Sequence, residues 1–207
     1  MILEACVETL AQAKAAEQGG AHQLELCGRL DLDGLTPLPE LVQQVQKEVG
    51  ILVKVMIRPR GGSFHHSEDE MELMIRQTAQ FWQAGIRHFV VGLATANKQL
   101  DLPNLRRICR AFPEADFTLH KVIDSVVDPL SYVPALNNIP NLAAILSSGG
   151  TPTALEGAAQ LIALREQLDS SKQLIAAGKI TATNLNEVHA KIPVGVYHGR
   201  RIVSTLQ

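Results

Sequence analysis

The stretch ILVKVMI, residues 51–57, is apolar at every position except Lys54. Such near-continuous apolar runs are typical of parallel strands that are buried on both faces, whereas strands with one wet face alternate. Seven further short stretches rich in apolar residues occur along the chain, and segments with helical patterns separate them. We expect strands at residues 2–6, 23–27, 52–57, 88–92, 117–120, 143–146, 174–177 and 194–197.

Helix signals fill the segments between these strands. The clearest helix runs from Glu68 to Ala84, because its apolar residues recur on one face. Ser67 and Glu70 form a capping box at its start. Thr36-Pro37 and Thr151-Pro152 each place a hydroxyl residue before a proline, which predicts two further helix starts.

Strands that alternate with helices along the whole chain predict a single α/β domain over residues 1–207. A closed TIM-type (β/α)₈ barrel is the favoured architecture, and an open doubly wound sheet is the alternative. The 207 residues are close to the lower limit of about 200 for such a barrel. Only residues 198–207 follow the last expected strand, so we expect the eighth helix to be short or missing.

Composition excludes several classes of protein. With 46% hydrophobic and 19% charged residues, the chain can bury a large core. The net charge is -2 and no basic stripe is present, so a nucleic-acid partner is not expected. No apolar run approaches the ~20 residues of a membrane span, and the N-terminus does not resemble a signal peptide. Three cysteines without such a leader predict reduced thiols in the cytoplasm.

Two cysteines close the first two strands. In Glu4-Ala5-Cys6 and Glu25-Leu26-Cys27, alternation puts each carboxylate and thiol on the same side. Neighbouring parallel strands lie roughly 4.8 Å apart, so Cys6 and Cys27 could share a metal ion. Two thiolates suit Cu(I) better than Mg²⁺ or Ca²⁺. The alternative is that both are small core residues, as many free cysteines are. Cys109, in a helical segment, is expected to serve helix packing.

An arginine pair follows the third strand. Arg58 and Arg60 stand beside Gly61-Gly62, where rigid donor forks and exposed backbone N–H groups favour anion binding. The alternative is that Arg58 points into the barrel and pairs with Glu4 and Glu25, because a buried charge needs a partner.

The later strands end in further candidates. His120 could move a proton or bind a metal, and Asp124 follows it. Ser148 and Gly149 belong to a small-residue loop that offers N–H groups to an anion. For His65-His66 we expect a solvated pair.

These segments, taken in order, resemble the CutC family of copper homeostasis proteins. The matching segments span almost the whole chain: residues 3–6, 20–21, 24–27, 34–37, 56–62, 118–120, 124 and 146–150. The resemblance implies a TIM-like barrel, a cytoplasmic location, a homodimer or homotetramer and an association with copper. It also implies that Cys6 and Cys27 act as Cu(I) ligands.

Three functions remain open from the sequence. The first is a copper-binding protein with Cys6 and Cys27 as metal ligands. The second is a barrel enzyme of lyase or isomerase type that acts on a small anionic or phosphorylated substrate. In that case His120, Asp124 and Glu25 would be catalytic, and the anion would be bound by Arg58, Arg60, Ser148 and Gly149. The third is a barrel kept for assembly or partner binding.

Overall fold

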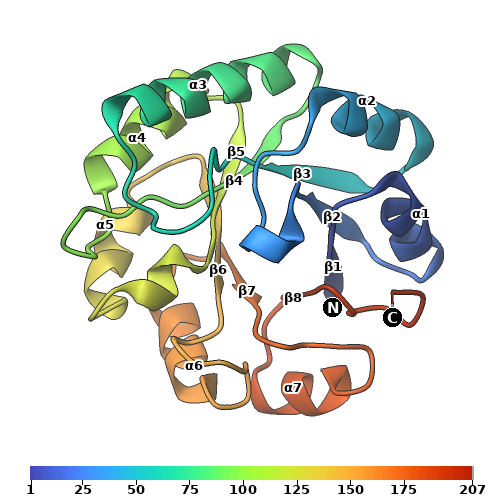
Figure 1. Cartoon of the computed structure of the whole chain (residues 1–207). Coiled ribbons are helices and arrows are strands. Elements are labelled where there is room, and N and C mark those ends of the chain that lie inside the picture. The colour runs from blue at the N-terminus through green and yellow to red at the C-terminus, as the bar shows by residue number, and fades with distance from the viewer. Residues whose placement is uncertain (207) are drawn as a thin grey trace.

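The computed structural model describes residues 1–206 as a closed barrel of eight parallel strands. The strands pair in chain order and β8 pairs with β1, which closes the sheet. Figure 1 shows the strands in the centre and the helices around them. The strands are β1 (Ile2–Val7), β2 (Gln23–Leu26), β3 (Leu52–Met56), β4 (His88–Val91), β5 (Asp116–Leu119), β6 (Leu142–Ser147), β7 (Gln173–Ala176) and β8 (Val196–Gly199).

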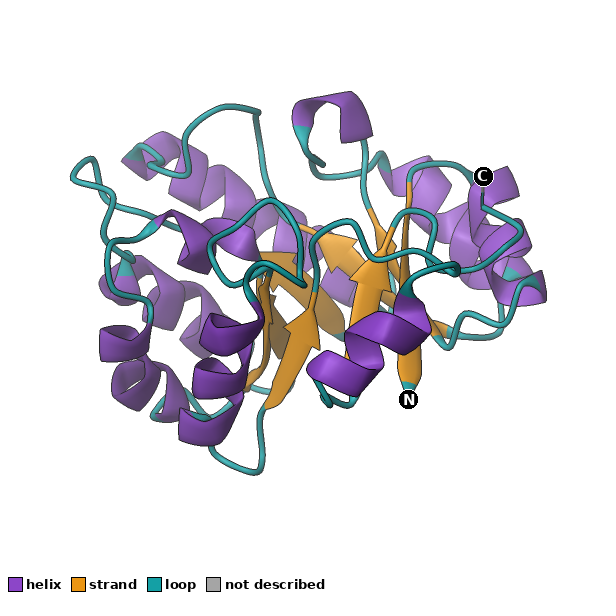
Figure 2. Cartoon of the chain, turned by 90° about the horizontal axis from the view of Figure 1, so that it is seen from below, coloured by secondary structure: helices purple, strands orange, loops and turns teal. Residues whose placement is uncertain are grey.

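Helices connect successive strands and cover the outside of the barrel, as the side view in Figure 2 also shows. The α-helices are α1 (Leu10–Gln18), α2 (Pro39–Glu48), α3 (Glu68–Gln83), α4 (Leu102–Ala111), α5 (Val133–Asn137), α6 (Ala158–Gln167) and α7 (Leu185–Lys191). Three short 3₁₀ helices lie in the connections: η1 (Leu30–Leu32), η2 (Lys121–Ser125) and η3 (Leu130–Tyr132).

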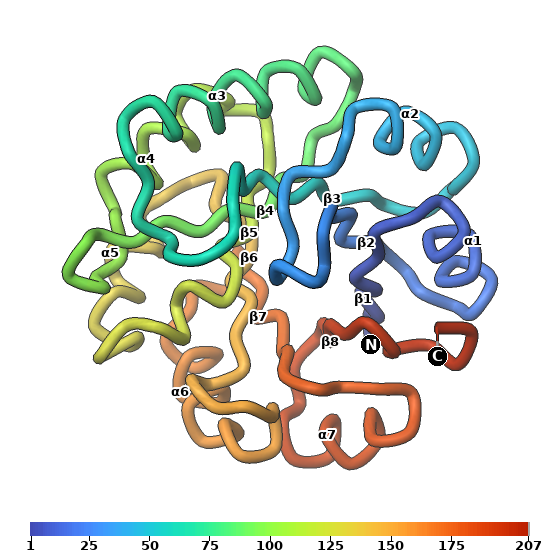
Figure 3. The backbone as a smooth tube through the Cα atoms, in the orientation of Figure 1, coloured from blue at the N-terminus to red at the C-terminus, as the bar shows by residue number. Residues whose placement is uncertain are grey.

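The predicted barrel is confirmed, and so is the absence of a regular eighth helix within the described part of the chain. Residues 200–206 instead run beside the N-terminal β–α unit, as the red end of the tube in Figure 3 shows. There Thr205 Oγ1 donates to the backbone oxygen of Ala15 in α1, at 2.5 Å. An irregular tail therefore covers the position of the missing helix.

The last strand begins two residues later than its predicted start at Val194. Val194 instead donates its N–H to the Tyr197 hydroxyl and to the backbone oxygen of Ile192, so it belongs to a turn. The strand also extends beyond its predicted end at Tyr197, and this extension matters for function because it includes His198.

The helix that was predicted most clearly, α3, has the expected start. Ser67 Oγ accepts the N–H of Glu70, and the Glu70 carboxylate accepts the N–H of Ser67, which completes the capping box.

The two helix starts predicted at Thr36 and Thr151 are wrong. Helix α2 begins only at Pro39, and α6 begins only at Ala158. Both hydroxyls hold loops at the carboxyl ends of the strands instead. Thr36 Oγ1 accepts the N–H of Arg58 at 2.9 Å, and Thr151 Oγ1 donates to a backbone oxygen within its own loop.

Two different environments meet inside the barrel. Ala144, Leu146, Ile175, Ala177 and Val196 form an apolar cluster from β6, β7 and β8. The strands β1, β2 and β3, together with His198 of β8, contribute polar and charged residues: Glu4, Gln23, Glu25 and Lys54 are buried, and His198 is half-buried. Buried charges require partners, so this side carries the polar network described next.

Candidate metal and ligand site in the barrel mouth

A cavity of about 790 Å³ opens at the carboxyl ends of the strands. Its walls come from the ends of the strands and from the loops that follow β2, β3, β5, β6, β7 and β8. This is the end of an α/β barrel where binding and catalytic residues gather, and the volume is typical of small-molecule sites.

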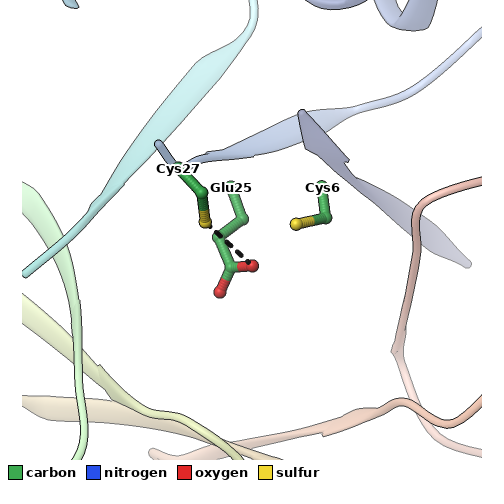
Figure 4. A group of neighbouring side chains, drawn as sticks. All are labelled: Cys6, Glu25 and Cys27. Carbon is green, nitrogen blue, oxygen red and sulfur yellow. Dashed lines mark hydrogen bonds between the residues drawn. The ribbon is translucent and has the colours of Figure 1, made fainter. Parts of the chain in front are cut away.

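Cys6, Cys27 and Glu25 form a compact group on one wall of this cavity (Figure 4). One ligand atom from each residue lies within 4.8 Å of the others. The thiol of Cys27 donates to Glu25 Oε2 at 3.7 Å. Alternation along β1 and β2 directs these side chains into the barrel, as the sequence predicted. Leu30 of η1 belongs to the same cluster of buried residues as both cysteines.

Both thiols hold their protons tightly. The pKa of Cys6 is raised by its hydrogen bond with Cys27, by burial and by the negative charge of Glu25. For Cys27, the hydrogen bond with Cys6 lowers the pKa, but burial and Glu25 outweigh it and leave the pKa raised. Both groups are therefore thiols at neutral pH, and a metal ion has to displace their protons.

A charged network lies beside the thiols. The Glu4 carboxylate lies 2.7 Å from Lys54 Nζ and 2.9 Å from His198 Nδ1, and it accepts a hydrogen bond from Gln23 Nε2 at 2.7 Å. His198 Nε2 lies 3.7 Å from Glu25 Oε2. His198 therefore bridges the two carboxylates.

The network is ionised. Burial raises the pKa of Glu4, but His198 and Lys54 outweigh it and lower the pKa to about 2. Burial lowers the pKa of His198, but Glu25, Cys6 and Glu4 raise it well above its usual value. Glu4, Glu25 and His198 also lie close enough to hold a metal ion. That set offers only oxygen and nitrogen ligands, whereas the thiol group offers the soft sulfur ligands that Cu(I) prefers, so the thiol group is the better candidate for copper.

Arg58 does not pair with Glu4 and Glu25, so that alternative is wrong. Lys54 pairs with Glu4 instead. Arg58 Nη1 donates to the backbone oxygens of residues 32, 33 and 34. Its Nη2 donates to the backbone oxygen of Gly62 at 2.9 Å. Arg58 therefore fixes the loop after β2 against the loop after β3, while its Nε has no hydrogen-bond partner among residues 1–206.

Arg60 is not among the residues that line the cavity. Its guanidinium binds Glu70 at 2.5 Å and also donates to backbone oxygens in residues 61–65. An external anion at this position would have to displace the Glu70 carboxylate.

The loop after β6 already binds a carboxylate of the protein itself, that of Asp124. Asp124 accepts the N–H groups of Ser148 and Gly150 at 2.8 and 3.1 Å, and the hydroxyls of Ser147 and Ser148 at 2.5 and 2.9 Å. The N–H of Gly149 donates to Ser147 Oγ. The donors that were predicted to hold an anion from outside thus surround Asp124.

His120 lies on the cavity wall opposite the thiols' network, against Gly92 and Phe64. Its Nδ1 accepts the N–H of Val122 at 3.0 Å, and its buried Nε2 has no hydrogen-bond partner in the described part of the chain. Burial, followed by the charge of Arg58, lowers the pKa of His120 to about 3. The ring is neutral at pH 7. The catalytic roles of His120, Asp124 and Glu25 stay predictions.

The expectation of a solvated histidine pair is wrong for one member. His65 is exposed, but the His66 side chain is only 1% exposed and lies 3.6 Å from Glu70. Burial is the main cause that lowers the pKa of His66. Cys109 lies buried in α4, as predicted.

His198 and Lys54 are the site residues that the sequence reasoning missed. Lys54 is the single charged residue of a buried strand, which indicates a charged partner inside the barrel. His198 was overlooked because the last strand was ended at Tyr197, two residues before its end at Gly199. Alternation extended by one position would have turned it inward.

Comparison with known proteins gives a consistent result. A model described as CutC family matches residues 1–203. The protein CutC of Glaesserella parasuis is 33% identical over 93% of this chain and 80% of its own length. The copper homeostasis protein cutC homolog of Homo sapiens is 35% identical over 90% of this chain and 68% of its own length.

Solved structures agree. A protein CutC from Streptococcus agalactiae superimposes with a TM-score of 0.91 at 25% identity, and covers 98% of this chain and 100% of its own. N-(5'-phosphoribosyl)anthranilate isomerase from Pyrococcus furiosus, with a TM-score of 0.59 and 12% identity, covers 96% of this chain and 86% of its own. That second likeness concerns the fold alone.

Proposed function

The chain belongs to the CutC family, and from that premise we propose that it acts in copper homeostasis by binding Cu(I) between Cys6 and Cys27. The observation that carries this proposal is the position of two thiols beside one carboxylate on the wall of an open cavity. Soft sulfur ligands favour Cu(I) over the harder divalent ions.

The distances support a shared ion. Metal–sulfur bonds of about 2.3 Å let two sulfurs bind one ion when they lie at most ~4.6 Å apart. The ligand atoms of Cys6, Cys27 and Glu25 lie within 4.8 Å of one another. Small rotations of the side chains are therefore enough to bring both sulfurs onto one ion.

The strand register disfavours a disulfide as the role of this pair. Cys6 pairs with Glu25 in the register of β1 and β2, so Cys27 lies two positions beyond the residue that Cys6 pairs with. Standard strand spacing then puts the two Cα atoms about 8 Å apart, beyond the ~7 Å that a disulfide spans without backbone movement. The pair is better placed to share a metal ion than to form a bond.

The surrounding charges suit the loss of two protons. Cu(I) carries one positive charge, and two thiolates carry two negative charges, so the loaded pair adds one negative charge to the site. His198 and Lys54 supply positive charge beside it, and Glu25 stands next to Cys27 to receive its proton. Affinity for Cu(I) should accordingly rise with pH.

The test is Cu(I) binding measured by competition with a chromophoric Cu(I) chelator under anaerobic conditions. The wild-type chain should bind one ion, and Cys27→Ser and Cys6→Ser should each lower the affinity about a thousandfold. Cys109→Ala, which removes a thiol buried in α4, is the matched control and should bind as the wild type does. Unchanged affinity in both serine variants would place any copper site elsewhere.

The part of the chain that the structure describes contains no helix that is long and apolar enough to cross a membrane. A cytoplasmic location is part of the proposal, because reduced thiols and Cu(I) both require a reducing compartment. A homodimer or homotetramer stays a prediction, which light scattering of the purified protein would test.

A further inference from the structure

Two buried N–H groups on the cavity wall have no acceptor. Within residues 1–206, Arg58 Nε and His120 Nε2 are buried and lack a hydrogen-bond partner. Both residues line the cavity, and both contact Phe64. The ring centroids of Phe64 and His120 lie 4.8 Å apart, and Arg58 Cζ lies 4.7 Å from the Phe64 centroid. These groups have no part in the proposed copper site.

The chemistry of the two groups identifies both as donors. A neutral imidazole carries one proton, and His120 Nδ1 accepts the N–H of Val122, so the proton is on Nε2. Arg58 Nε always carries its proton. A buried donor without an acceptor is costly, and a ligand oxygen would satisfy it.

The rim of the same cavity carries positive charge. Lys121, Lys179, Arg200 and Arg201 line it, are exposed, and make no ion pair within the described residues. The acidic residues on the lining are Glu25, Asp33 and Asp124. Glu25 faces His198, and Asp124 is surrounded by its own donors. Asp33 is the exposed acidic residue of this lining, and the four rim cations outnumber it.

Lys179 is held there by an unusual backbone. It has φ +53° and follows Gly178, which has φ +109°. A Cβ at Gly178 would lie 2.7 Å from the backbone nitrogen of Ala154, so the turn is tightly constrained. Non-glycine residues in such conformations concentrate at functional sites.

We propose that this cavity binds a small organic oxyanion, whose oxygen atoms accept from His120 Nε2–H and Arg58 Nε–H and whose charge is held by Lys121 and Lys179. The ligand class is a carboxylate or a phosphate ester of a few carbon atoms. The site uses different residues from Arg60, Ser148 and Gly149, whose donors are already occupied within the protein. It also uses none of the ligand atoms of the thiol pair, which lies in the same cavity.

Calorimetric titration tests the proposal with inorganic phosphate, glycerol 3-phosphate and citrate as probes and with uncharged glycerol as the blank. At least one anion should bind, and Lys179→Asn should weaken it about tenfold. Asparagine tolerates the left-handed backbone, so this variant removes the charge without new strain. Lys98→Asn is the matched control, because Lys98 is also exposed, has φ +57° and does not line the cavity.

His120 provides the second readout. With ¹⁵N-labelled histidine, the Nε2–H signal of His120 should shift when the anion is added. His120→Asn should bind about tenfold more weakly, because its short side chain can still accept the N–H of Val122 but does not reach the ligand. Circular dichroism verifies that this variant folds.

Cys27→Ser separates the two proposals and should bind the anion as the wild type does. No binding of any of the three anions would overturn the oxyanion site. An affinity that is equal in the wild type, Lys179→Asn and His120→Asn would also overturn it, because the anion would then bind elsewhere.

Discussion

The thiol pair on β1 and β2 and the Asp124 loop after β5 and β6 look alike in sequence and differ in structure. Each brings a carboxylate and small polar residues to the carboxyl ends of neighbouring strands. Around Asp124, two N–H groups and two hydroxyls satisfy the carboxylate. The polar neighbours of the Cys6 and Cys27 sulfurs are fewer: each other, Glu25 and, for Cys6, His198. A polar group marks a binding site when its capacity to bind is left unused, and residue type alone does not decide this.

The largest effect on stability should come from the charged network that lies beside the thiols. Lys54→Met removes the cation that pairs with buried Glu4, and breaking a buried pair costs about 3–5 kcal/mol. Urea unfolding measures this loss. Lys14→Met is the control, because its ion pair with Glu48 is on the surface and should contribute less than about 1 kcal/mol. Equal losses in the two variants would show that the Glu4 network does not stabilise the barrel.

The next largest effect should separate the Asp124 loop from the thiol pair. Asp124→Asn keeps the shape but loses charge-assisted acceptance from Ser147 and Ser148, which should cost about 2–3 kcal/mol of unfolding free energy. Affinity for Cu(I) should not change. Asp128→Asn, in an exposed loop, is the control. A loss of Cu(I) binding in Asp124→Asn would show that the two regions act together.

The contribution of His120 to the free energy of unfolding should decrease over a defined acidic pH range. In the folded chain, the pKa of His120 lies at about 3 because of burial and the charge of Arg58, while its ordinary value is 6.5. Above pH 6.5 the ring is neutral in both states, so its stability contribution is complete. Below pH 6.5 only the unfolded chain takes up the proton, so the unfolding free energy falls as the pH drops toward 3.

His120→Asn removes this titration. Between pH 6.5 and 4.5 its unfolding free energy should decline less steeply than that of the wild type, by about 1–2 kcal/mol in total. Glu4 contributes mainly below that range, because its pKa of about 2 in the folded chain compares with an ordinary 4.5. His65→Asn, at an exposed histidine, is the control. Parallel curves for the wild type and His120→Asn would refute this assignment.

The smallest effect on stability should occur where the effect on binding is greatest. Cys27→Ser exchanges a thiol for a hydroxyl of similar shape that can still donate to Glu25, so the unfolding free energy should change by less than about 1 kcal/mol. The same variant should lose most of its affinity for Cu(I). A loss of several kcal/mol would identify Cys27 as a core residue, which is the alternative that the sequence left open.

Much of the site could be predicted because it depends on alternation within single strands. Glu25 is on β2 and Cys27 directly follows it, two residues further along, so extended backbone turns them to the same side wherever the strand packs. Arg58 could not be predicted in this way. Its acceptors are backbone oxygens of residues 32–34, and no pattern in the sequence shows where a loop places its carbonyl groups.

The sequence by itself determined the eight-fold alternation of strand and helix and the inward direction of the cysteines, because local periodicity encodes both features. Only the tertiary structure decided which polar groups remain available. Asp124 meets residues 147–150, and His198 meets Glu4 from the opposite end of the chain, because barrel closure brings β8 against β1. Hydrogen-bond saturation depends on such distant partners. Hydrogen-bond saturation therefore distinguishes the thiol pair and the unpartnered donors of His120 and Arg58 from polar residues that only hold loops in place.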